Sequence, residues 1–532
     1  MQTEYIHETN SIMRVIERTI RENWDFPAFS DYGTHITFTY KDVAHECARL
    51  HDYFKSKGIE KGDRIAICDR NSSKWAVSYL AALTYGAVTV PILQDFSGEQ
   101  ICNILGHCEA KLLICGPSIL TKTGEVSVKV LDINSVGSLA YDGPFAKADV
   151  HYFDDNADDL AMLSYTSGST GHSKGVMLPY RTIWSNIAFA DEKLMLPSHS
   201  NVVSLLPMAH MYGFSFEFMY EFCIGCHVHF LTKAPSPTVL LKVFSDVRPD
   251  IVIAVPLIIE KIVQGKIFPI IRAVQMRSLL MLPIVRNIIY RRIRSKLMDV
   301  FGGRFYEVVV GGAAFNSEVE TFLKLIKFPY TVGYGMTECG PIICYRDWKS
   351  FAKTSCGEAA PRMEVKILSE DPHNIPGEIV TKGMNVMLGY YKNPEATAEA
   401  IDSEGWLHTG DLGTIDADGN VFIRGRAKNM LLGSNGQNIY PEEIEEKLTG
   451  HVLIDECVVV QRGDKLVGLV YTSDDTLKRH GMTRADFENQ LDRYRHHINR
   501  MLPNFCALSA LESRNEEFEK TPKRNIRRFL YK

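Results

Sequence analysis

Continuous apolar runs alternate with amphipathic stretches along the first two thirds of the chain. Residues 37–91 show the pattern first, as a strand, an amphipathic helix, the buried strand DRIAICD, a second helix and a further strand. Short apolar runs of the same kind follow at AMLSYT, NVVSLLP, DIVIAVP and RFYEVVVGG. Because helices alternate with strands that lack a polar face, we predict parallel sheets covered by helices on both faces.

The pattern changes after Gly357. GEAAPRMEVKIL, GEIVTKG and GNVFIRGR are short alternating strands with turn residues between them, which predicts a small antiparallel β unit. Beyond Arg426 a helix that begins at a proline, two strands and a last helix near residues 484–501 predict a compact α+β module. We therefore predict an α/β fold with a large N-terminal domain over residues 1–427 and a small α+β domain over residues 428–532.

Composition narrows the class of protein. The chain has 532 residues, 45% hydrophobic and 23% charged, with a net charge of −5, which does not favour a nucleic-acid partner. The first twenty residues hold no apolar segment typical of a secretory signal, and the run IVIAVPLII is about half the length of a membrane-spanning helix. Twelve scattered cysteines then indicate reduced thiols and a cytoplasmic location.

One cysteine cluster, CIGCHVH at residues 223–229, matches the pattern of covalent haem attachment and also holds four zinc-ligand side chains. Its flanks instead predict an apolar helix, a glycine, and a strand with His227 and His229 on the outer face. Haem attachment normally follows export, for which no signal is present. We favour the helix–turn–strand interpretation over a metal or haem site.

The stretch SYTSGSTGHSKGVMLPY, residues 164–180, combines glycines, hydroxyl side chains and one lysine directly after a buried strand. Glycines let backbone N–H groups approach an anion, while hydroxyls and lysine donate to its oxygens, so the pattern indicates a phosphate site. It is not a Walker P-loop, because Lys174 precedes Gly175 instead of following the last glycine.

That stretch resembles the phosphate loop of the adenylate-forming superfamily, which includes acyl-CoA synthetases, the adenylation domains of peptide synthetases and beetle luciferase. The other stretches of the family follow in order: VGYGMTECGP (332–341), GEIVTKGMNVMLGYYKNPEAT (377–397), GWLHTGDLG (405–413) and GRAKNMLLGSNGQNIYPEEIE (425–445). The resemblance covers nearly the whole chain. It implies an acyl-CoA synthetase/luciferase-like fold whose C-terminal domain is mobile.

The resemblance also implies a reaction in two halves. A carboxylate attacks the α-phosphate of ATP, giving an acyl-adenylate and pyrophosphate, and a thiol then attacks the activated carbonyl. ATP, Mg²⁺ and coenzyme A are the expected cofactors, with an acyl carrier protein as the alternative acceptor. Positioning, magnesium and cationic donors should dominate the first half.

Residue roles follow from the matched motifs. The resemblance assigns the β- and γ-phosphates to Thr166, Ser167, Gly168, Ser169, Thr170, Gly171 and Lys174. It assigns magnesium to Glu338 and Thr170, and the nucleotide to Gly311, Gly312, Ala313, Tyr334, Gly335, Thr337, Asp411 and Arg426. Asp411 would accept hydrogen bonds from the ribose hydroxyls. Taken alone, Glu338 also fits a first-turn acid of a helix and Asp411 a turn aspartate.

Three further residues complete the implied machinery. Lys428 matches the hinge on which the C-terminal domain rotates, and Gly436 matches a loop that approaches the pantetheine arm of coenzyme A. His210, in PMAHMYGF, would gate the carboxylate and so joins Lys174 and Glu338 as a catalytic candidate. A histidine among apolar residues is also a common core residue.

Residues 255–296 form a long insert in which large aliphatic side chains interleave with basic ones. Between Lys261 and Lys296 there are nine basic residues and no acidic one. Two interpretations of the insert remain: a solvated pair of basic helices, or an element near the acyl entrance that contacts the inner face of the membrane. The insert resembles that of long-chain fatty acyl-CoA synthetases, so we expect a medium- or long-chain fatty acid, with an aryl acid as the alternative.

The C-terminal segment TPKRNIRRF departs from the family pattern T-P-x-x-K-I-x-R. Asn525 occupies the position of the lysine that contacts the carboxylate and the α-phosphate, and Lys523 lies two residues earlier. A neutral amide supplies no cation to the transition state. We expect slow adenylation, and a poorly active acyl-adenylate-binding protein is the alternative to a ligase.

Overall fold

The computed structural model of the protein describes residues 6–139, 145–167, 173–194, 196–232, 236–432, 438–463, 465–521 and 526–531. Its largest sheet has the strand order β19-β8-β7-β4-β3-β5-β6. These strands are β3 (Arg64–Cys68), β4 (Val88–Pro91), β5 (Leu112–Cys115), β6 (Lys129–Asp132), β7 (Leu160–Ser167), β8 (Ser173–Pro179) and β19 (Gly389–Tyr390). The five strands from β7 to β6 in this order are parallel, as the uninterrupted apolar runs predict.

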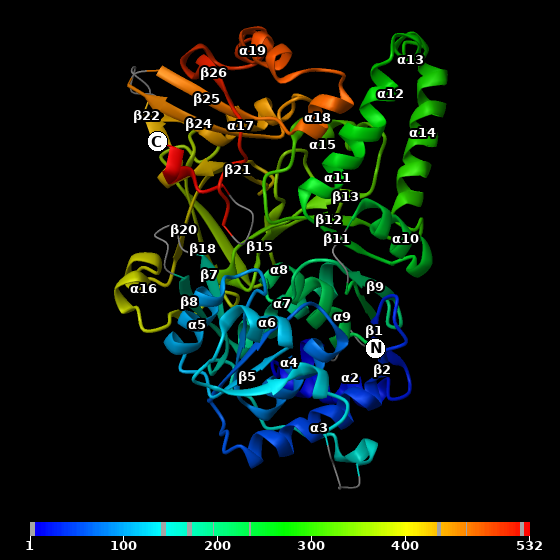
Figure 1. The fold of residues 1–532 in the computed structure, drawn as a ribbon, viewed down its shortest axis with the longest axis vertical. Helices are drawn as coiled ribbons and strands as arrows, with labels where there is room; N and C mark the ends of the chain where they lie inside the picture. The colour runs from blue at the N-terminus through cyan, green and yellow to red at the C-terminus, as the bar shows by residue number, and fades with distance from the viewer. Residues whose placement is uncertain are drawn as a thin grey trace.

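Helices α3 (Tyr40–Ser56), α4 (Ser73–Tyr85), α5 (Gly98–His107) and α6 (Pro117–Thr123) pack around this sheet (Figure 1). The second sheet is β2 (Thr37–Thr39), β1 (Pro27–Asp31), β10 (His227–Phe230) and β9 (Asn201–Ser204), parallel except for the β1–β2 pair. The third is parallel and consists of β11 (Val252–Ala254), β12 (Val308–Val310) and β13 (Tyr330–Val332). The mixed α/β fold class predicted from the sequence is confirmed.

Strands β7 and β8 form an antiparallel hairpin at one side of the parallel strands, and β19 pairs antiparallel with β8 at the edge of the sheet. The sequence pattern places Lys174 and Gly175 in the loop after β7, whereas the structure places both in β8, with Lys174 opposite Thr166. The loop is shorter than expected because pairing with β7 satisfies the backbone groups of these residues. This register fixes the base of the glycine-rich loop.

The CIGCHVH segment has the predicted local structure. Helix α9 (Tyr220–Cys223) ends just before Gly225, and strand β10 follows with Val228 and Phe230 buried and His227 and His229 only partly buried. All twelve cysteines carry free thiols. Among the residues that the structure describes, no group of three or more histidine, cysteine or acidic side chains is placed to hold a metal ion.

The antiparallel β unit predicted after Gly357 is present. It comprises β17 (Met363–Leu368), β18 (Gly377–Gly383), β20 (Leu407–Ile415) and β21 (Val421–Arg426), beside a smaller sheet of β14 (Tyr334–Gly335), β15 (Ile342–Tyr345) and β16 (Glu358–Ala359). The chain then forms β22 (Leu431–Leu432), β23 (Asn438–Ile439), α17 (Pro441–Thr449), β24 (Glu456–Arg462), β25 (Lys465–Tyr471), α18 (Asp474–Arg479), α19 (Arg484–Asn499) and β26 (Leu508–Arg514). These C-terminal elements enclose a hydrophobic core of their own around Leu448 and Phe487. The domain division at residues 427 and 428 stays a prediction.

The other helices lie between or around the sheets. They are α2 (Ile12–Glu22), α7 (Tyr180–Lys193), α8 (Met211–Phe214), α10 (Pro237–Val247), α11 (Pro256–Ile262), α12 (Phe268–Arg272), α13 (Val274–Leu280), α14 (Pro283–Val300), α15 (Ser317–Leu325) and α16 (Pro394–Ala400). Within the described ranges, no helix is long and apolar enough to cross a membrane.

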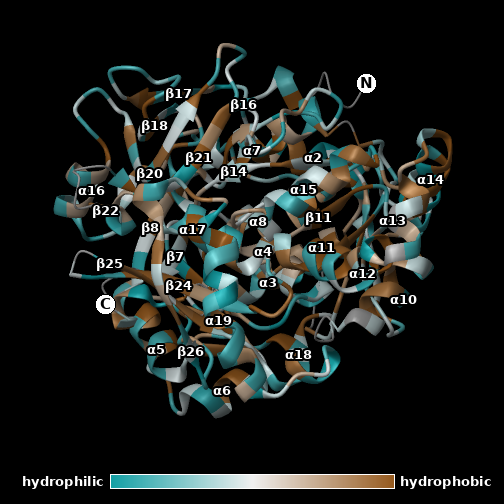
Figure 2. Ribbon diagram, turned by 90° about the horizontal axis from the view of Figure 1, so that it is seen from above, coloured by the Kyte–Doolittle hydropathy of each residue, from teal (hydrophilic) through white to brown (hydrophobic). Residues whose placement is uncertain are grey.

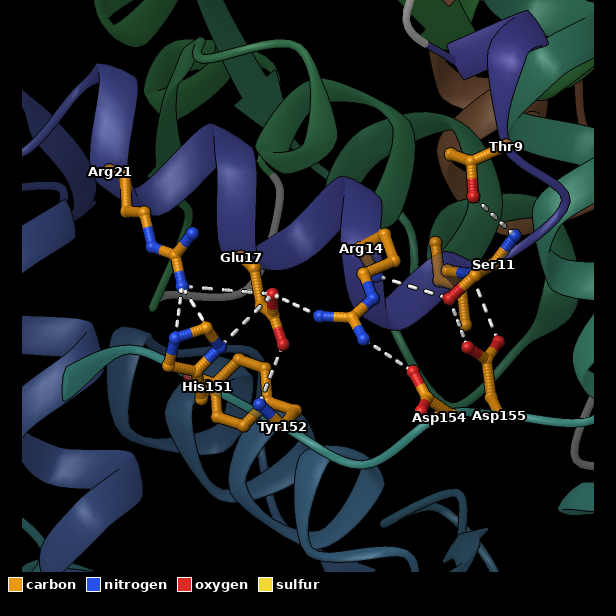
Figure 3. Close-up of polar contacts among 10 residues, drawn as sticks. Thr9, Ser11, Arg14, Glu17, Arg21, His151, Tyr152, Asp154 and Asp155 are labelled. Carbon is orange, nitrogen blue, oxygen red and sulfur yellow. Dashed lines mark hydrogen bonds and ion pairs between the residues drawn. The ribbon is translucent and has the colours of Figure 1, made fainter. Parts of the chain in front are cut away.

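Helix α2 is held against the segment that leads into β7 by a buried carboxylate (Figure 3). Glu17 accepts from the guanidinium of Arg14 at 3.0 Å and from the backbone N–H of Tyr152 at 2.6 Å. Asp155 accepts from the backbone N–H of Ile12 at 3.0 Å. Because removing one partner of a buried charge is costly, these contacts fix the segment that leads into β7, the strand before the glycine-rich loop.

A second buried carboxyl group has no such partners. Glu221 in α9 is fully buried, and neither of its oxygens has a hydrogen-bond partner among the described residues. Burial raises its pKa from the usual 4.5 to about 8. The group is therefore protonated in the folded protein at neutral pH.

We predict that Glu221 makes the folded state lose stability as pH rises from 4.5 to about 8. In that interval the side chain of Glu221 is ionised in the unfolded chain but keeps its proton in the folded protein. Each pH unit therefore lowers the free energy of unfolding by at most about 1.4 kcal/mol. Glu221→Gln should flatten the pH dependence of the unfolding free energy and stabilise the protein at pH 8 more than at pH 5. Chemical denaturation at both pH values tests this, with the exposed Glu125→Gln as control. Equal effects of the two variants would contradict it.

Candidate nucleotide and acyl site

A cavity opens between α8, β12, β14 and β15. It holds about 580 Å³ of space, counting the part that is open to solvent. Six of the residues predicted from the sequence line it: His210, Gly311, Gly312, Tyr334, Gly335 and Thr337. Residues that are 100 or more positions apart in the chain therefore line the same cavity.

Two of these glycines are needed for different reasons, one for lack of space and one for its backbone conformation. A Cβ atom on Gly335 would lie 2.1 Å from the carbonyl oxygen of Pro341, and Gly312 has φ of +86°, which L residues with side chains rarely adopt. Bare backbone at both positions leaves a flat wall beside Tyr334. A planar ring could lie against such a wall.

Asp411 joins the two antiparallel sheets at the edge of this cavity. Its Oδ2 accepts from the hydroxyl of Tyr334 at 2.7 Å, and its Oδ1 lies 2.9 Å from Nε of Arg426, the residue opposite it in the β20–β21 ladder. Burial raises the pKa of Asp411, whereas the Arg426 guanidinium and the Tyr334 hydroxyl oppose that shift. Both protein partners are donors, so the carboxylate is a ready acceptor for hydroxyl groups.

Lys174 and Glu338 meet through a tyrosine that the sequence analysis did not single out. Tyr390 donates to Oε1 of Glu338 at 2.9 Å, and Nζ of Lys174 lies 4.6 Å from the centre of the Tyr390 ring. Strand β19, which carries Tyr390, pairs with β8, which carries Lys174. The position of Tyr390 in GYYKNP, within a family stretch, was the available signal for it.

His210 lies at the start of α8, where its Nδ1 accepts from the backbone N–H of Tyr212 at 3.4 Å. The residue is only partly buried and lines the cavity. This position differs from that of a histidine enclosed in a core. Tyr212 also lines the cavity, and its hydroxyl donates to the carbonyl of Val309 at 3.0 Å.

The inner wall of the cavity is aromatic. The Phe189 ring packs edge-on against Phe216 and Tyr345, with ring centroids 5.9 Å and 5.4 Å away. Tyr345 donates to Glu307, a fully buried acid whose pKa burial raises to about 8. The acid and the tyrosine are both neutral at neutral pH, so this wall is apolar on the cavity side. The hydrogen bond to Glu307 holds the Tyr345 ring in place from the side away from the cavity.

Some predicted residues lie elsewhere. Ala313 is exposed and does not line the cavity, Thr166 lies near the end of β7, and Lys428 is exposed in a short turn between β21 and β22. Residues 168–171, Gly436, Lys523 and Asn525 lie outside the described residues, and of Ser167 only the backbone is described.

Two known sequence families match most of the chain. A sequence model of the AMP-binding enzyme family matches residues 16–391, and one of the AMP-binding enzyme C-terminal domain matches residues 428–531. The long-chain-fatty-acid–CoA ligase FadD15 of Mycobacterium bovis is 29% identical over 85% of this chain and 80% of its own. The 4-coumarate–CoA ligase 5 of Oryza sativa subsp. japonica is 29% identical over 85% and 82%.

Solved structures show the same fold. The o-succinylbenzoate CoA synthetase of Bacillus subtilis in complex with its acyl-adenylate intermediate has a TM-score of 0.79 at 19% identity, over 97% of this chain and 98% of that one. ATP-bound MatB of Rhodopseudomonas palustris has a TM-score of 0.78 at 21% identity, with the same coverage. With its family models matched in order over most of its length, the chain belongs to the AMP-binding enzyme family.

Proposed function

We propose that the protein is an ATP-dependent acid–CoA ligase that first forms an acyl-adenylate. The observation that carries the proposal is a set of three features, one that lines the cavity and two that adjoin its lining residues Tyr334 and Thr337. These are the glycine and tyrosine wall at Tyr334 and Gly335, the buried carboxylate of Asp411, and the Lys174–Tyr390–Glu338 group that follows Thr337 of the cavity lining. They suit the base, the ribose and the phosphates of one nucleotide, in that order.

Each nucleotide contact has a physical reason. The adenine ring would lie on the wall that Gly311, Gly312 and Tyr334 form, and the ribose hydroxyls would donate to Asp411. Lys174 would supply a positive charge to the β- and γ-phosphates together with the loop that begins at Thr166. Because Tyr334 and Arg426 already hold Asp411, binding needs little reorganisation of the site.

Glu338 fits a magnesium ion. It offers hard carboxylate oxygens, only Oε1 of which accepts a hydrogen bond from a described residue, and Mg²⁺ is bound in proteins through one or two carboxylates shared with phosphate oxygens. Bound there, the ion would neutralise charge on the phosphates. Tyr390 orients the carboxylate, and Thr170 is the second proposed ligand from the sequence alone.

In the first half-reaction a carboxylate oxygen of the acid forms a bond to the α-phosphorus while the bond from that phosphorus to the bridging oxygen breaks. Pyrophosphate leaves with the electron pair. In the second half, the sulfur of coenzyme A attacks the acyl carbonyl and AMP leaves. His210 lies where the carboxylate would enter, and we propose that the C-terminal residues 428–532 rotate at Lys428 to bring Gly436 to the pantetheine arm. An acyl carrier protein is the alternative acceptor.

The acid is proposed to be a medium- or long-chain fatty acid, and the apolar lining of the cavity supports an aliphatic or aromatic tail over a charged one. The aromatic wall of Phe189, Phe216 and Tyr345 also favours a second candidate, an aryl acid, since flat rings pack well edge-on. The similarity to both fatty-acid and 4-coumarate ligases supports both substrate classes equally.

We predict that Glu338→Gln raises the Mg²⁺ concentration needed for half-maximal pyrophosphate release. Tyr390→Phe, which removes only the hydroxyl that orients Glu338, should raise it by about 10-fold, the usual cost of losing an outer hydrogen bond to a metal ligand. Titration of Mg²⁺ at saturating ATP measures both. Glu364→Gln, an exposed acid on β17, is the matched control. An unchanged Mg²⁺ requirement in Glu338→Gln would remove the residue from the proposed site.

We predict that Phe216→Ala shifts the substrate preference toward longer or bulkier acids, because it removes one ring of the aromatic wall. The ratio of kcat/KM for a long-chain to a medium-chain fatty acid, and for 4-coumarate, should change by about 10-fold or more. Phe214→Ala, a buried neighbour that does not line the cavity, controls for lost stability. A parallel fall for every acid in both variants would mean that Phe216 does not limit the pocket.

We predict that Asn525→Lys accelerates pyrophosphate release, by about 10-fold or more, since it restores a cation at the proposed position beside the α-phosphate. Thioester formation from a supplied acyl-adenylate should change much less. Lys523→Ala, made in the natural chain, tests whether that neighbouring lysine already supplies the cation. No gain in Asn525→Lys together with full activity in Lys523→Ala would show that neither position supplies the cation.

A further inference from the structure

A helical hairpin of α12, α13 and α14 projects from the body of the protein (Figure 1). Helix α14 has 18 residues, of which only Leu297 is buried. A surface helix of a globular protein normally buries an apolar stripe. The second half of this helix packs Tyr290, Ile293 and Met298 against the core, whereas Ile284 and Ile288 in its first turns stay exposed. Packing within the chain therefore does not explain the apolar side chains at its start.

Large apolar side chains are exposed around the tip between α13 and α14. Met281 is 82% exposed and Ile284 is 77% exposed, and Leu279, Leu282 and Ile288 are also exposed. Seen from above, α13 and α14 lie at the rim of the molecule, with hydrophobic ribbon beside α14 (Figure 2). A contiguous apolar patch of this kind indicates an interaction surface, whereas scattered single residues would not.

The charges of the same segment have one sign. Nine basic residues and no acidic one lie between Lys261 and Lys296, in a chain whose net charge is −5. Arg272 pairs with Glu318. Six other basic residues form no ion pair within the described part of the chain: Lys261, Lys266, Arg286, Arg291, Arg292 and Lys296. The charge of this surface is therefore complementary to a negatively charged partner.

On one side of α14 the exposed apolar groups come before the basic ones along the helix axis, and Arg286 lies on the opposite side. Ile284, Ile288, Arg291 and Arg292 follow at helical spacings that place them on one side of the helix. At 1.5 Å per residue, Arg291 lies about 10 Å beyond Ile284. With the tip inserted end-on, that separation is comparable to the depth, about 5–10 Å, to which membrane-surface helices bury apolar side chains at the boundary between headgroups and acyl chains.

We propose that the α13–α14 tip docks onto an anionic lipid bilayer. Met281, Leu282 and Ile284 enter the boundary between headgroups and acyl chains, and Arg291, Arg292 and Lys296 contact lipid phosphates. A second copy of the chain would bring like charges together, and an acidic protein surface would pair the arginines while leaving the apolar tip without an apolar environment. The inference does not depend on the proposed reaction, because lipid binding needs neither ATP nor an acid substrate.

Vesicle flotation of the full-length protein tests the proposal. We expect binding to vesicles that contain phosphatidylglycerol, little binding to phosphatidylcholine alone, and weaker binding at high salt. Arg291→Gln/Arg292→Gln/Lys296→Gln should lower the partition coefficient on the order of 100-fold, roughly fivefold for each charge. Met281→Ser/Ile284→Ser should lower it about 10-fold or more, since it removes apolar area from the tip.

The matched control is Lys55→Gln/Lys111→Gln/Lys478→Gln, which removes three exposed lysines outside the hairpin and should bind vesicles like the wild type. Equal loss in the control and the hairpin variant would overturn the proposal, because binding would then follow net charge alone. Three other outcomes would also overturn it: no binding of the wild type to anionic vesicles, binding to an acidic carrier protein only, or a concentration-dependent dimer without vesicle binding. Circular dichroism of every variant checks that the fold is kept.

Discussion

The site depends on one constraint: the buried carboxylate of Asp411 must be paired. Its two partners come from different sheets, Tyr334 from β14 and Arg426 from the end of β21. A charge left unpaired at this depth would cost several kcal/mol, so the two antiparallel sheets are held in register with each other. The same contact places the tyrosine ring along the cavity wall and ends β21 just before the proposed hinge. The contact between the two antiparallel sheets and the proposed contact with the ribose meet at this residue.

Buried acids in this protein fall into two groups. Glu17 and Asp411 have cationic partners and serve as fixed points between elements, whereas Glu221 and Glu307 lie in apolar surroundings that raise their pKa to about 8. Glu307 accepts the hydroxyl of Tyr345 and so fixes the aromatic wall from behind. No such use follows from the contacts of Glu221. Because Glu307 is neutral, the interior behind Tyr345 carries no charge beside the proposed acyl pocket, which suits an apolar substrate tail.

The hairpin of α13 and α14 concerns the way such a tail would reach the protein. Acids with long apolar tails partition into membranes, and an enzyme acting on them gains from contact with the lipid surface. The segment concentrates positive charge in a chain that is negative overall, and its apolar tip points away from the core. Lipid docking and catalysis would then be separate properties of one molecule, carried by different elements. The first needs only exposed side chains, and the second needs the interior arrangement.

The sequence alone determined the fold class and the order of elements, and it predicted most of the residues of the proposed nucleotide site, because strand periodicity, glycine spacing and the ordered motifs are local properties of the chain. It placed Glu338, Asp411 and Tyr334 in motifs without stating how they meet. Only the tertiary structure decided that Lys174 lies in a strand opposite Thr166, that Tyr390 links Lys174 to Glu338, and that Phe189, Phe216 and Tyr345 close the cavity. Some of these contacts join residues more than 200 positions apart in the chain. Strand register and side-chain packing between such distant segments leave no periodic signal in the sequence.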